Sequence, residues 1–200
     1  MTARLVLYDN PGSSNALKVR FLLQELGLEA DLIEVPLDGE RPEWYREVHP
    51  FGTVPCLVDG DLRLVESNTI LRYLADREGR DDLYPRDLRA RARVDELLDA
   101  LSIAVRPALR EFELRSHYAT SPYPPHEVAA AREGLSRALL GWEELIEPGG
   151  AVTGSFSIAD IAATAQLRLL PNLPIDLGAF PKTRQMLDTA GSRPAYLAAL

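Results

Sequence analysis

The stretch that most constrains the fold of this chain covers residues 53–60 and continues through residues 64–71. Pro55 has no backbone N–H to donate, so it belongs at the first residue of a strand or in a special turn. The pair Asp59-Gly60 stands between two apolar runs, which is a strong signal for a tight hairpin. The pattern therefore predicts a turn into a strand, a hairpin, a second strand and then the start of a helix.

The start of this helix is polar. Glu66, Ser67 and Asn68 come before the apolar residues Ile70 and Leu71. The first backbone N–H groups of a helix have no acceptor within the helix, and the helix dipole is positive at this end. The sequence therefore predicts that this helix start can bind an anion.

The residues before this stretch show a strand, a helix and a second strand. A short apolar run at residues 5–8 predicts a buried strand, and a cluster of turn formers follows it at residues 9–15. The apolar face of residues 17–26 predicts a helix, which Gly27 is placed to end. A second strand is expected at residues 31–35. A strand, a helix and a strand in this order form a right-handed parallel crossover.

The second half of the chain shows only helical patterns. It follows residues 76–87, which have the charged composition of a linker. We expect long helices over residues 88–118, with a bend near Pro107, and over residues 127–146. The run Ser157-Ile158-Ala159-Asp160 has the signature of a capping box that opens a third helix. These signals predict an all-α second domain.

Composition limits the classes of partner. The 200 residues are 46% hydrophobic and 26% charged, as in ordinary globular proteins. A net charge of −8 argues against binding to nucleic acid or to anionic membranes. Cys56 is the single cysteine, so no internal disulfide can form, and as a residue of an apolar strand it is expected to be buried and inert. We see no secretory leader and expect a cytoplasmic, reduced protein.

Two motifs carry a family resemblance. Gly52-Thr53-Val54-Pro55, followed by Glu66-Ser67 eleven residues after the proline, resembles the glutathione-binding half of cytosolic glutathione transferases. Gly154-Ser155-Phe156-Ser157-Ile158-Ala159-Asp160 is similar to a standard feature of the helical domain of the same family. The chain looks like a serine-type, bacterial-like member, and the resemblance extends over essentially its full length.

The resemblance implies an α/β + all-α fold. An N-terminal thioredoxin-like domain would cover residues 1–79, and an all-helical glutathione-transferase C-terminal domain with the second-substrate site would cover residues 87–200. The implied activity is transfer of glutathione to a small electrophile, or reduction of a peroxide, in detoxification. Glutathione is then a co-substrate, no metal is needed, and a homodimer is expected.

The resemblance also implies roles for particular residues. The bond before Pro55 would be cis, and the backbone of Val54 would pair with the cysteinyl unit of glutathione. Glu66 and Ser67 would hold the γ-glutamyl group. Arg41 lies where relatives often carry a Lys or His for the glycine carboxylate, although it could equally be a solvated surface arginine.

Thiol activation needs donors near the sulfur, because an ordinary thiol with a pKa near 8.5 is only a few per cent ionised at pH 7. Ser13 falls where serine-type transferases place the activating serine, with either its hydroxyl or its backbone N–H as the donor. Asn15 is the second candidate and Ser14 the third, and all three could instead simply cap the helix. Tyr8 lies one residue short of the place where other branches use a tyrosine, so we expect it in the core.

Two alternatives stay open at this point. Some relatives with this fold are non-catalytic binding or scaffold proteins, and others use a different small thiol. The sequence departs from the family at Thr53, where many relatives have a longer donor, and at His49, which we expect to stabilise a turn. The intact Glu66-Ser67 pair and the donor-rich loop favour an enzyme.

Overall fold

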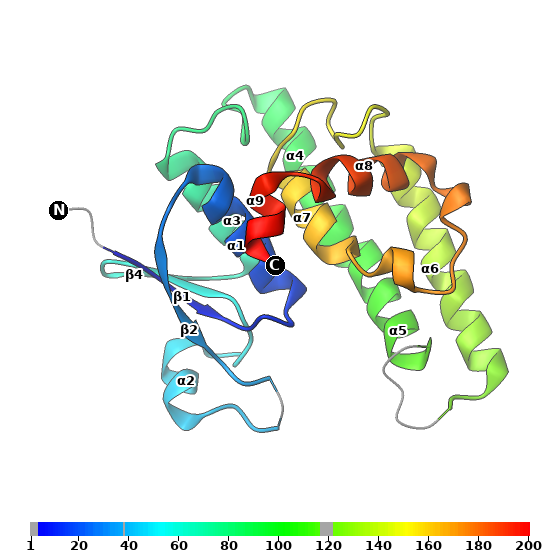
Figure 1. Ribbon diagram of the computed structural model, residues 1–200, viewed down its shortest axis with the longest axis horizontal. Coiled ribbons are helices and arrows are strands. Elements are labelled where there is room, and N and C mark those ends of the chain that lie inside the picture. Colours follow the sequence, from blue (N-terminus) through cyan, green and yellow to red (C-terminus); the bar gives the residue numbers. More distant parts are fainter. Residues whose placement is uncertain (1–3, 38, 117–121) are drawn as a thin grey trace. The chain divides into compact units, whose positions relative to one another are not determined.

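The computed structural model describes residues 4–37, 39–116 and 122–200, and it divides into two compact units (Figure 1). The first unit joins Met1–Tyr84 to Ser192–Leu200, and the second is Pro85–Gly191. The sequence instead assigned the last residues of the chain to the helical domain. They lie with the first unit because the side chains of helix α9 (Pro194–Ala199) pack on α1, with the rings of Tyr196 and Phe21 5.3 Å apart.

The first unit is built on a four-stranded sheet with the strand order β2-β1-β3-β4. Strands β1 and β2 are parallel, as the predicted crossover requires, while β3 is antiparallel to both β1 and β4. The hairpin expected at Asp59-Gly60 joins β3 and β4. The elements are β1 (Leu5–Asp9), α1 (Ser14–Leu26), β2 (Ala30–Glu34), α2 (Glu43–Val48), β3 (Cys56–Asp59), β4 (Leu62–Val65) and α3 (Ser67–Arg77).

A small apolar cluster lies beneath the start of α1. It joins Ala16, Val35, Tyr45 and Val54, and Tyr8 packs against it. The ring of Tyr8 is 5.6 Å from that of Tyr45, so Tyr8 contributes to packing, as the strand register suggested. The cluster connects the end of β2, helix α2 and the entry to β3, which fixes the segment before Pro55 against the helix that follows the first loop.

Over the part that the structure describes, the second unit contains helices and no strands, which confirms the predicted fold class. The long helix expected over residues 88–118 is interrupted by a π-helical segment just before Pro107. Residues 117–121, which include the end of that predicted helix, lie outside the described residues. The elements are α4 (Leu88–Ala100), η1 (Leu101–Val105), α5 (Arg106–Ser116), α6 (Pro125–Leu145), α7 (Ile158–Leu167), η2 (Leu170–Asn172), η3 (Leu177–Ala179) and α8 (Pro181–Gly191).

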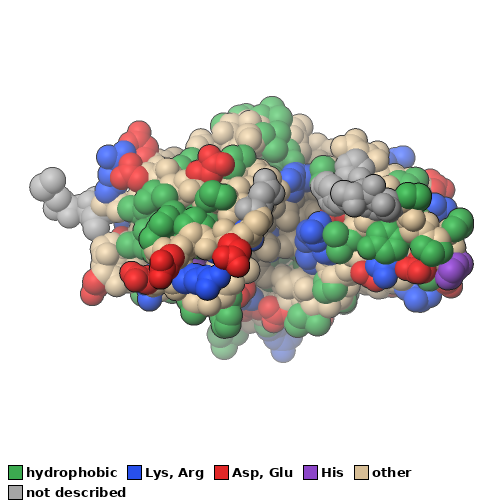
Figure 2. Space-filling model, turned by 90° about the horizontal axis from the view of Figure 1, so that it is seen from below, with side chains coloured by type: hydrophobic (Ala, Val, Ile, Leu, Met, Phe, Trp, Pro, Cys, Tyr) green, Lys and Arg blue, Asp and Glu red, His purple; other side chains and the backbone are tan. Residues whose placement is uncertain are grey.

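Surface charge and helix hydropathy bear on binding to nucleic acid and on membrane spanning. Basic and acidic side chains are scattered over the face shown in Figure 2 and form no single basic patch there. Within the described ranges, none of the helices is both long and apolar enough to span a membrane.

The capping box at the start of α7 forms as the sequence indicated. The Ser157 side chain accepts from the backbone N–H of Ala159 at 3.2 Å, and the Asp160 carboxylate accepts from the backbone N–H of Ser157 at 2.8 Å. Asp160 also accepts from the backbone N–H of Val152 at 2.7 Å. Its carboxylate therefore ties the preceding loop to a helix whose residues are all buried.

Burial raises the pKa of Asp160 to about 6, against the opposing effect of these donors. The folded protein binds the Asp160 proton more tightly than the unfolded chain does, because the folded pKa lies above the ordinary value of 3.8. Protonation of Asp160 therefore stabilises the fold. This contribution is fully present below pH 3.8 and is lost as the pH rises through about 6. Asp160→Asn cannot titrate in this range. The unfolding free energy of the wild type minus that of the variant should therefore fall by about 2 kcal/mol between about pH 4.5 and pH 7.

Urea unfolding of both proteins at the two pH values measures this difference. A difference that stays constant, or that grows toward neutral pH, would show that Asp160 does not titrate in this way.

Candidate functional site

The segment that enters β3 carries the first part of the site. The Val54–Pro55 peptide bond is cis, in agreement with the family resemblance, and Val54 is buried. The Tyr45 hydroxyl donates to the Thr53 carbonyl at 2.7 Å. His49 lies beneath this segment, where its Nδ1 accepts from the backbone N–H of Phe51 at 3.2 Å and its Nε2 lies 3.1 Å from the Thr53 hydroxyl. Burial lowers the pKa of His49, which suits a neutral ring that stabilises the turn.

The start of α3 carries the second part. Glu66 stands just before the helix with φ at 69°, a left-handed conformation that a residue with a long side chain adopts only at a cost. Its exposed carboxylate does not cap the helix and makes no hydrogen bond or ion pair within the described ranges. The strained backbone thus presents a carboxylate that the fold itself does not use. Ser67, the first residue of α3, is buried.

The starts of α1 and α3 meet at Ser67. The Ser67 hydroxyl donates to the side-chain oxygen of Asn15 at 3.4 Å, and Lys18 Nζ donates to Ser67 Oγ at 3.2 Å. Lys18 also donates to the Asn68 side chain at 3.0 Å. The structure therefore brings together two segments, around Ser13 and around Glu66, that lie about fifty residues apart in sequence.

Sequence reasoning missed Lys18. This residue is one of only two lysines in the chain and is almost completely buried. A lysine between the apolar residues Leu17 and Val19 was the available signal. Buried ammonium groups need polar partners, so a lysine at this place in a helix indicates a polar junction.

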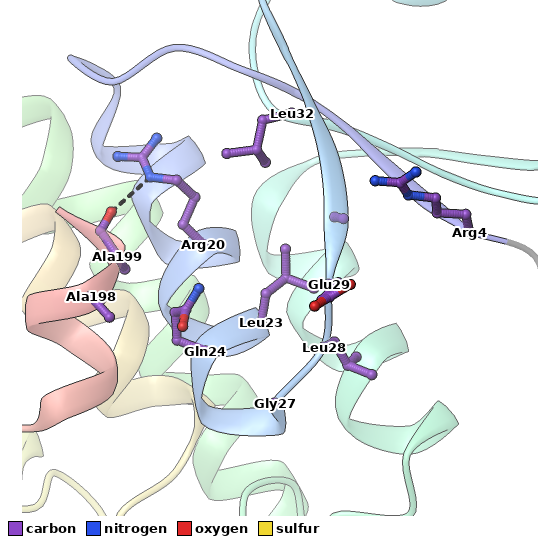
Figure 3. Close-up of a pocket in the computed structure, with 11 residues that line it drawn as sticks. Arg4, Arg20, Leu23, Gln24, Gly27, Leu28, Glu29, Leu32, Ala198 and Ala199 are labelled. Carbon is purple, nitrogen blue, oxygen red and sulfur yellow. Dashed lines mark hydrogen bonds between the residues drawn. The ribbon is translucent and has the colours of Figure 1, made fainter.

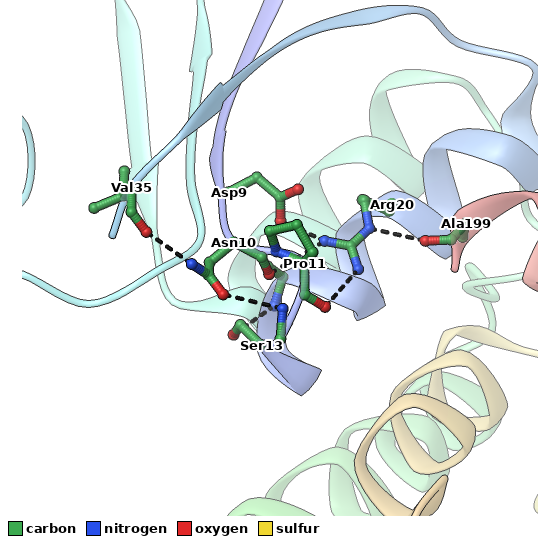
Figure 4. A network of polar contacts seen from close by, with 9 residues as sticks. Asp9, Asn10, Pro11, Ser13, Arg20, Val35 and Ala199 are labelled. Carbon is green, nitrogen blue, oxygen red and sulfur yellow. Dashed lines mark hydrogen bonds and ion pairs between the residues drawn. The ribbon is translucent and has the colours of Figure 1, made fainter. Parts of the chain in front are cut away.

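Ser13 caps α1, and this sets which of its groups can act on a ligand. Its side-chain oxygen accepts from the backbone N–H of Ala16 at 3.2 Å, and its own backbone N–H donates to the Asn10 carbonyl at 2.9 Å (Figure 4). The backbone donor is therefore already engaged. A hydroxyl that accepts a hydrogen bond still has its own hydrogen to donate, so the cap and a donor role are compatible in one side chain.

Asn15 and Arg41, predicted for thiol activation and for the glycine carboxylate, both have contacts within the fold. The side-chain oxygen of Asn15 is directed to Ser67, as described above. Arg41 donates to backbone carbonyls, from Nε to Gly52 at 2.8 Å and from Nη1 to Pro36 at 3.1 Å. The guanidinium group thus fastens the loop before α2 to the turn before Pro55, a structural role that the sequence did not suggest.

Cys56 does not take part in the site. Its side chain is fully buried, and burial raises the pKa of its thiol to about 11. A thiol in this state is a poor nucleophile at neutral pH. Among the residues that the structure describes, no group of three or more His, Cys, Asp or Glu is placed to hold a metal ion.

A cavity of about 550 Å³ lies elsewhere in the first unit, next to α1, β2 and α9 (Figure 3). Ser13, Val54, Glu66 and Ser67 are not among the residues that line it. The lining residues are Arg4, Arg20, Leu23, Gln24, Gly27, Leu28, Glu29, Ala30, Leu32, Ala198 and Ala199.

Comparisons with known proteins agree with this geometry. Residues 12–77 match the family model of the glutathione S-transferase N-terminal domain. The chain is 29% identical to glutathione S-transferase 1 of Manduca sexta, over 96% of this chain and 90% of that protein. It is 31% identical to a probable glutathione S-transferase of Oryza sativa subsp. japonica, over 96% of this chain and 94% of that protein.

A solved structure of a glutathione transferase has the same fold as this chain. The glutathione transferase of Burkholderia graminis, which has two glutathione molecules bound per subunit, is 26% identical. The superposition has a TM-score of 0.88 and covers 98% of this chain and 87% of that chain.

Proposed function

Because the chain belongs to the glutathione S-transferase family, we propose that it is an enzyme that activates the thiol of glutathione for attack on a small electrophile. The observation that carries this proposal is the junction at Ser67, where the starts of α1 and α3 meet through Asn15. Two helix N-termini side by side favour negative charge. Glutathione supplies two such charges near its γ-glutamyl and cysteinyl units, a carboxylate and, once ionised, a thiolate.

Each part of the site suits one part of the tripeptide. The unused carboxylate of Glu66 would pair with the ammonium of the γ-glutamyl unit, and the start of α3 at Ser67 would receive its carboxylate. The backbone of Val54 would pair with the cysteinyl unit. These contacts would hold the sulfur toward the Ser13 hydroxyl. Arg41 remains a candidate for the glycine carboxylate, with the loop-fastening role described above as its other function.

Thiol activation follows from the same arrangement. Lowering a thiol pKa by about 2 takes roughly 2.7 kcal/mol of preferential stabilisation of the anion. A hydrogen bond from the Ser13 hydroxyl and the dipole of α1 can together supply energy of this order. The thiol proton leaves to solvent. The thiolate then forms a bond to an electrophilic carbon, and the leaving group departs with its electron pair.

The assembly and location belong to the same proposal. We expect a homodimer and a cytoplasmic location, in keeping with the family and with the single buried cysteine. The electrophile is left at the level of chemical class, a small carbon electrophile or a peroxide.

Calorimetric titration with glutathione tests the binding step. Glu66→Gln should weaken glutathione binding about tenfold, because an ion pair to the ligand ammonium is replaced by a neutral contact. Glu34→Gln is the matched control, since it removes the same charge from an exposed strand position of the same unit and should leave the affinity unchanged. Turnover of a generic aryl halide by the wild type completes the test.

The alternative outcomes are separable. If the wild type gives neither heat nor a thermal shift with glutathione, the enzyme proposal fails and a non-catalytic scaffold becomes the better reading. If a panel of other small thiols binds instead, the thiol specificity assigned here is wrong.

A further inference from the structure

We propose that Arg20 is a positioning residue for thiol activation, because it holds the loop that carries Ser13 and ties this loop to the C-terminal helix α9. The inference rests on the function proposed above. It adds that the last residues of the chain influence the chemistry at Ser13, although they come almost two hundred residues later in sequence.

The first contact of Arg20 is with Asp9. Arg20 lies on α1 and is only 9% exposed, while Asp9, the last residue of β1, is 5% exposed. Nη1 of Arg20 is 2.5 Å from Oδ1 of Asp9. Two buried charges at this distance hold each other in place, since removing either would leave the other unpaired away from water. The guanidinium group is therefore fixed against Asp9, the residue at which strand β1 ends.

The second set of contacts reaches the loop itself. Nη1 donates to the Asn10 carbonyl and Nη2 to the Pro11 carbonyl, both at 3.4 Å. The Asn10 carbonyl also accepts from the backbone N–H of Ser13 at 2.9 Å, so one oxygen joins Arg20 to Ser13 (Figure 4). On its other side the loop is held by the Asn10 amide, which donates to the Val35 carbonyl at 2.9 Å.

The third contact joins the end of the chain. Nε of Arg20 donates to the Ala199 carbonyl at 2.9 Å. Ala199 is the last residue of α9, where backbone carbonyls have no donor within the helix. The planar guanidinium group thus serves three directions at once: Asp9, the loop carbonyls and α9. A lysine ammonium offers a single charged point and cannot reproduce this fork.

The positioning matters because a hydrogen bond to sulfur depends on distance and angle. A displacement of about 1 Å at a catalytic group is enough to reduce a rate strongly. Arg20 and Ala199 also border the cavity shown in Figure 3, so a shorter side chain at position 20 can be solvated from that side. Loss of the fork should therefore loosen the loop without collapsing the unit.

The test is Arg20→Lys, with the pKa of the bound thiol as the readout. We expect the pKa of enzyme-bound glutathione, measured by thiolate absorbance against pH, to rise by about one, which lowers the thiolate fraction about tenfold below that pKa. The affinity for glutathione should change less than threefold, since Val54, Glu66 and Ser67 are untouched. Arg193→Lys is the matched control, because Arg193 ties the α9 segment to Glu25 at the other end of α1.

A second variant guards against misfolding. Deletion of Ala199 and Leu200 keeps the Arg20–Asp9 pair and removes the α9 carbonyl, and it should raise the pKa of the bound thiol in the same direction. Thermal unfolding identifies which variants are folded. A bound-thiol pKa equal to that of the wild type in the folded variants overturns the inference. If the wild type does not lower the thiol pKa of glutathione, the proposed function fails instead, before any variant is compared.

Discussion

Ser13→Ala should lower kcat/KM for glutathione conjugation about 100-fold near pH 6.5, because the donor that stabilises the thiolate is lost. The backbone N–H of Ser13 cannot substitute, since it already donates to the Asn10 carbonyl at 2.9 Å. The loss should shrink as the pH rises, because free glutathione ionises without help above its own pKa. A pH profile of kcat/KM therefore distinguishes a change in thiol pKa from a general loss of active protein.

A matched control separates chemistry from capping. Ser13 and Ser157 both cap helices with their hydroxyls, so replacing either by Ala should cost about 1 kcal/mol of stability. Only Ser13→Ala should raise the pKa of the bound thiol, whereas Ser157→Ala should leave the pH profile as it is. If Ser13→Ala loses stability but keeps the wild-type profile, the hydroxyl serves the helix alone and thiol activation must be assigned elsewhere.

The sequence could predict those parts of the site whose signals are local. The hairpin at Asp59-Gly60 and the polar start of α3 at Glu66-Ser67 each depend on a few neighbouring residues with strong preferences. The same is true of the capping box at Ser157-Asp160. Because these signals also lie at separations typical of one family, the fold class could be predicted from them, while the roles of the site residues stay predictions.

Contacts between residues far apart in the sequence could not be predicted from such local signals. Arg20 and Ala199 are 179 residues apart, and nothing near either residue indicates the other. Arg41 bonds to the carbonyl of Gly52, and a carbonyl has no sequence identity to recognise. The placement of α9 on the first unit depends on the packing of Tyr196 against Phe21, which no local pattern reports.

The bend predicted near Pro107 shows how far a local rule extends. Proline removes one donor from a helix and disturbs the turn before it, so an irregularity was expected just there. The structure resolves it as a π-helical segment over Leu101–Val105 between α4 and α5. The rule predicts where the irregularity lies but not that it takes the form of a π-helix.

Glu143→Ala should destabilise the helical unit by about 4 kcal/mol. Glu143 is buried on α6, and its carboxylate accepts from the backbone N–H of Thr183 at 2.7 Å and from the Thr183 hydroxyl at 2.5 Å. It also accepts from the backbone N–H of Lys182 at 3.2 Å. The two backbone N–H groups belong to the first turn of α8, where backbone N–H groups have no acceptor within their own helix.

The interaction is reciprocal, which is why the loss should be large. Lys182 Nζ donates to the carbonyls of Glu143 and Ile146 at 2.6 Å and 2.8 Å, at the end of α6. The end of α6 and the start of α8 thus cap each other, and Glu143→Ala would leave buried donors of Thr183 without a partner. Glu144→Ala, at the exposed neighbouring position, removes the same charge and should change stability by less than about 0.5 kcal/mol. Equal urea midpoints for the two variants would show that this mutual cap contributes no more than an ordinary surface carboxylate.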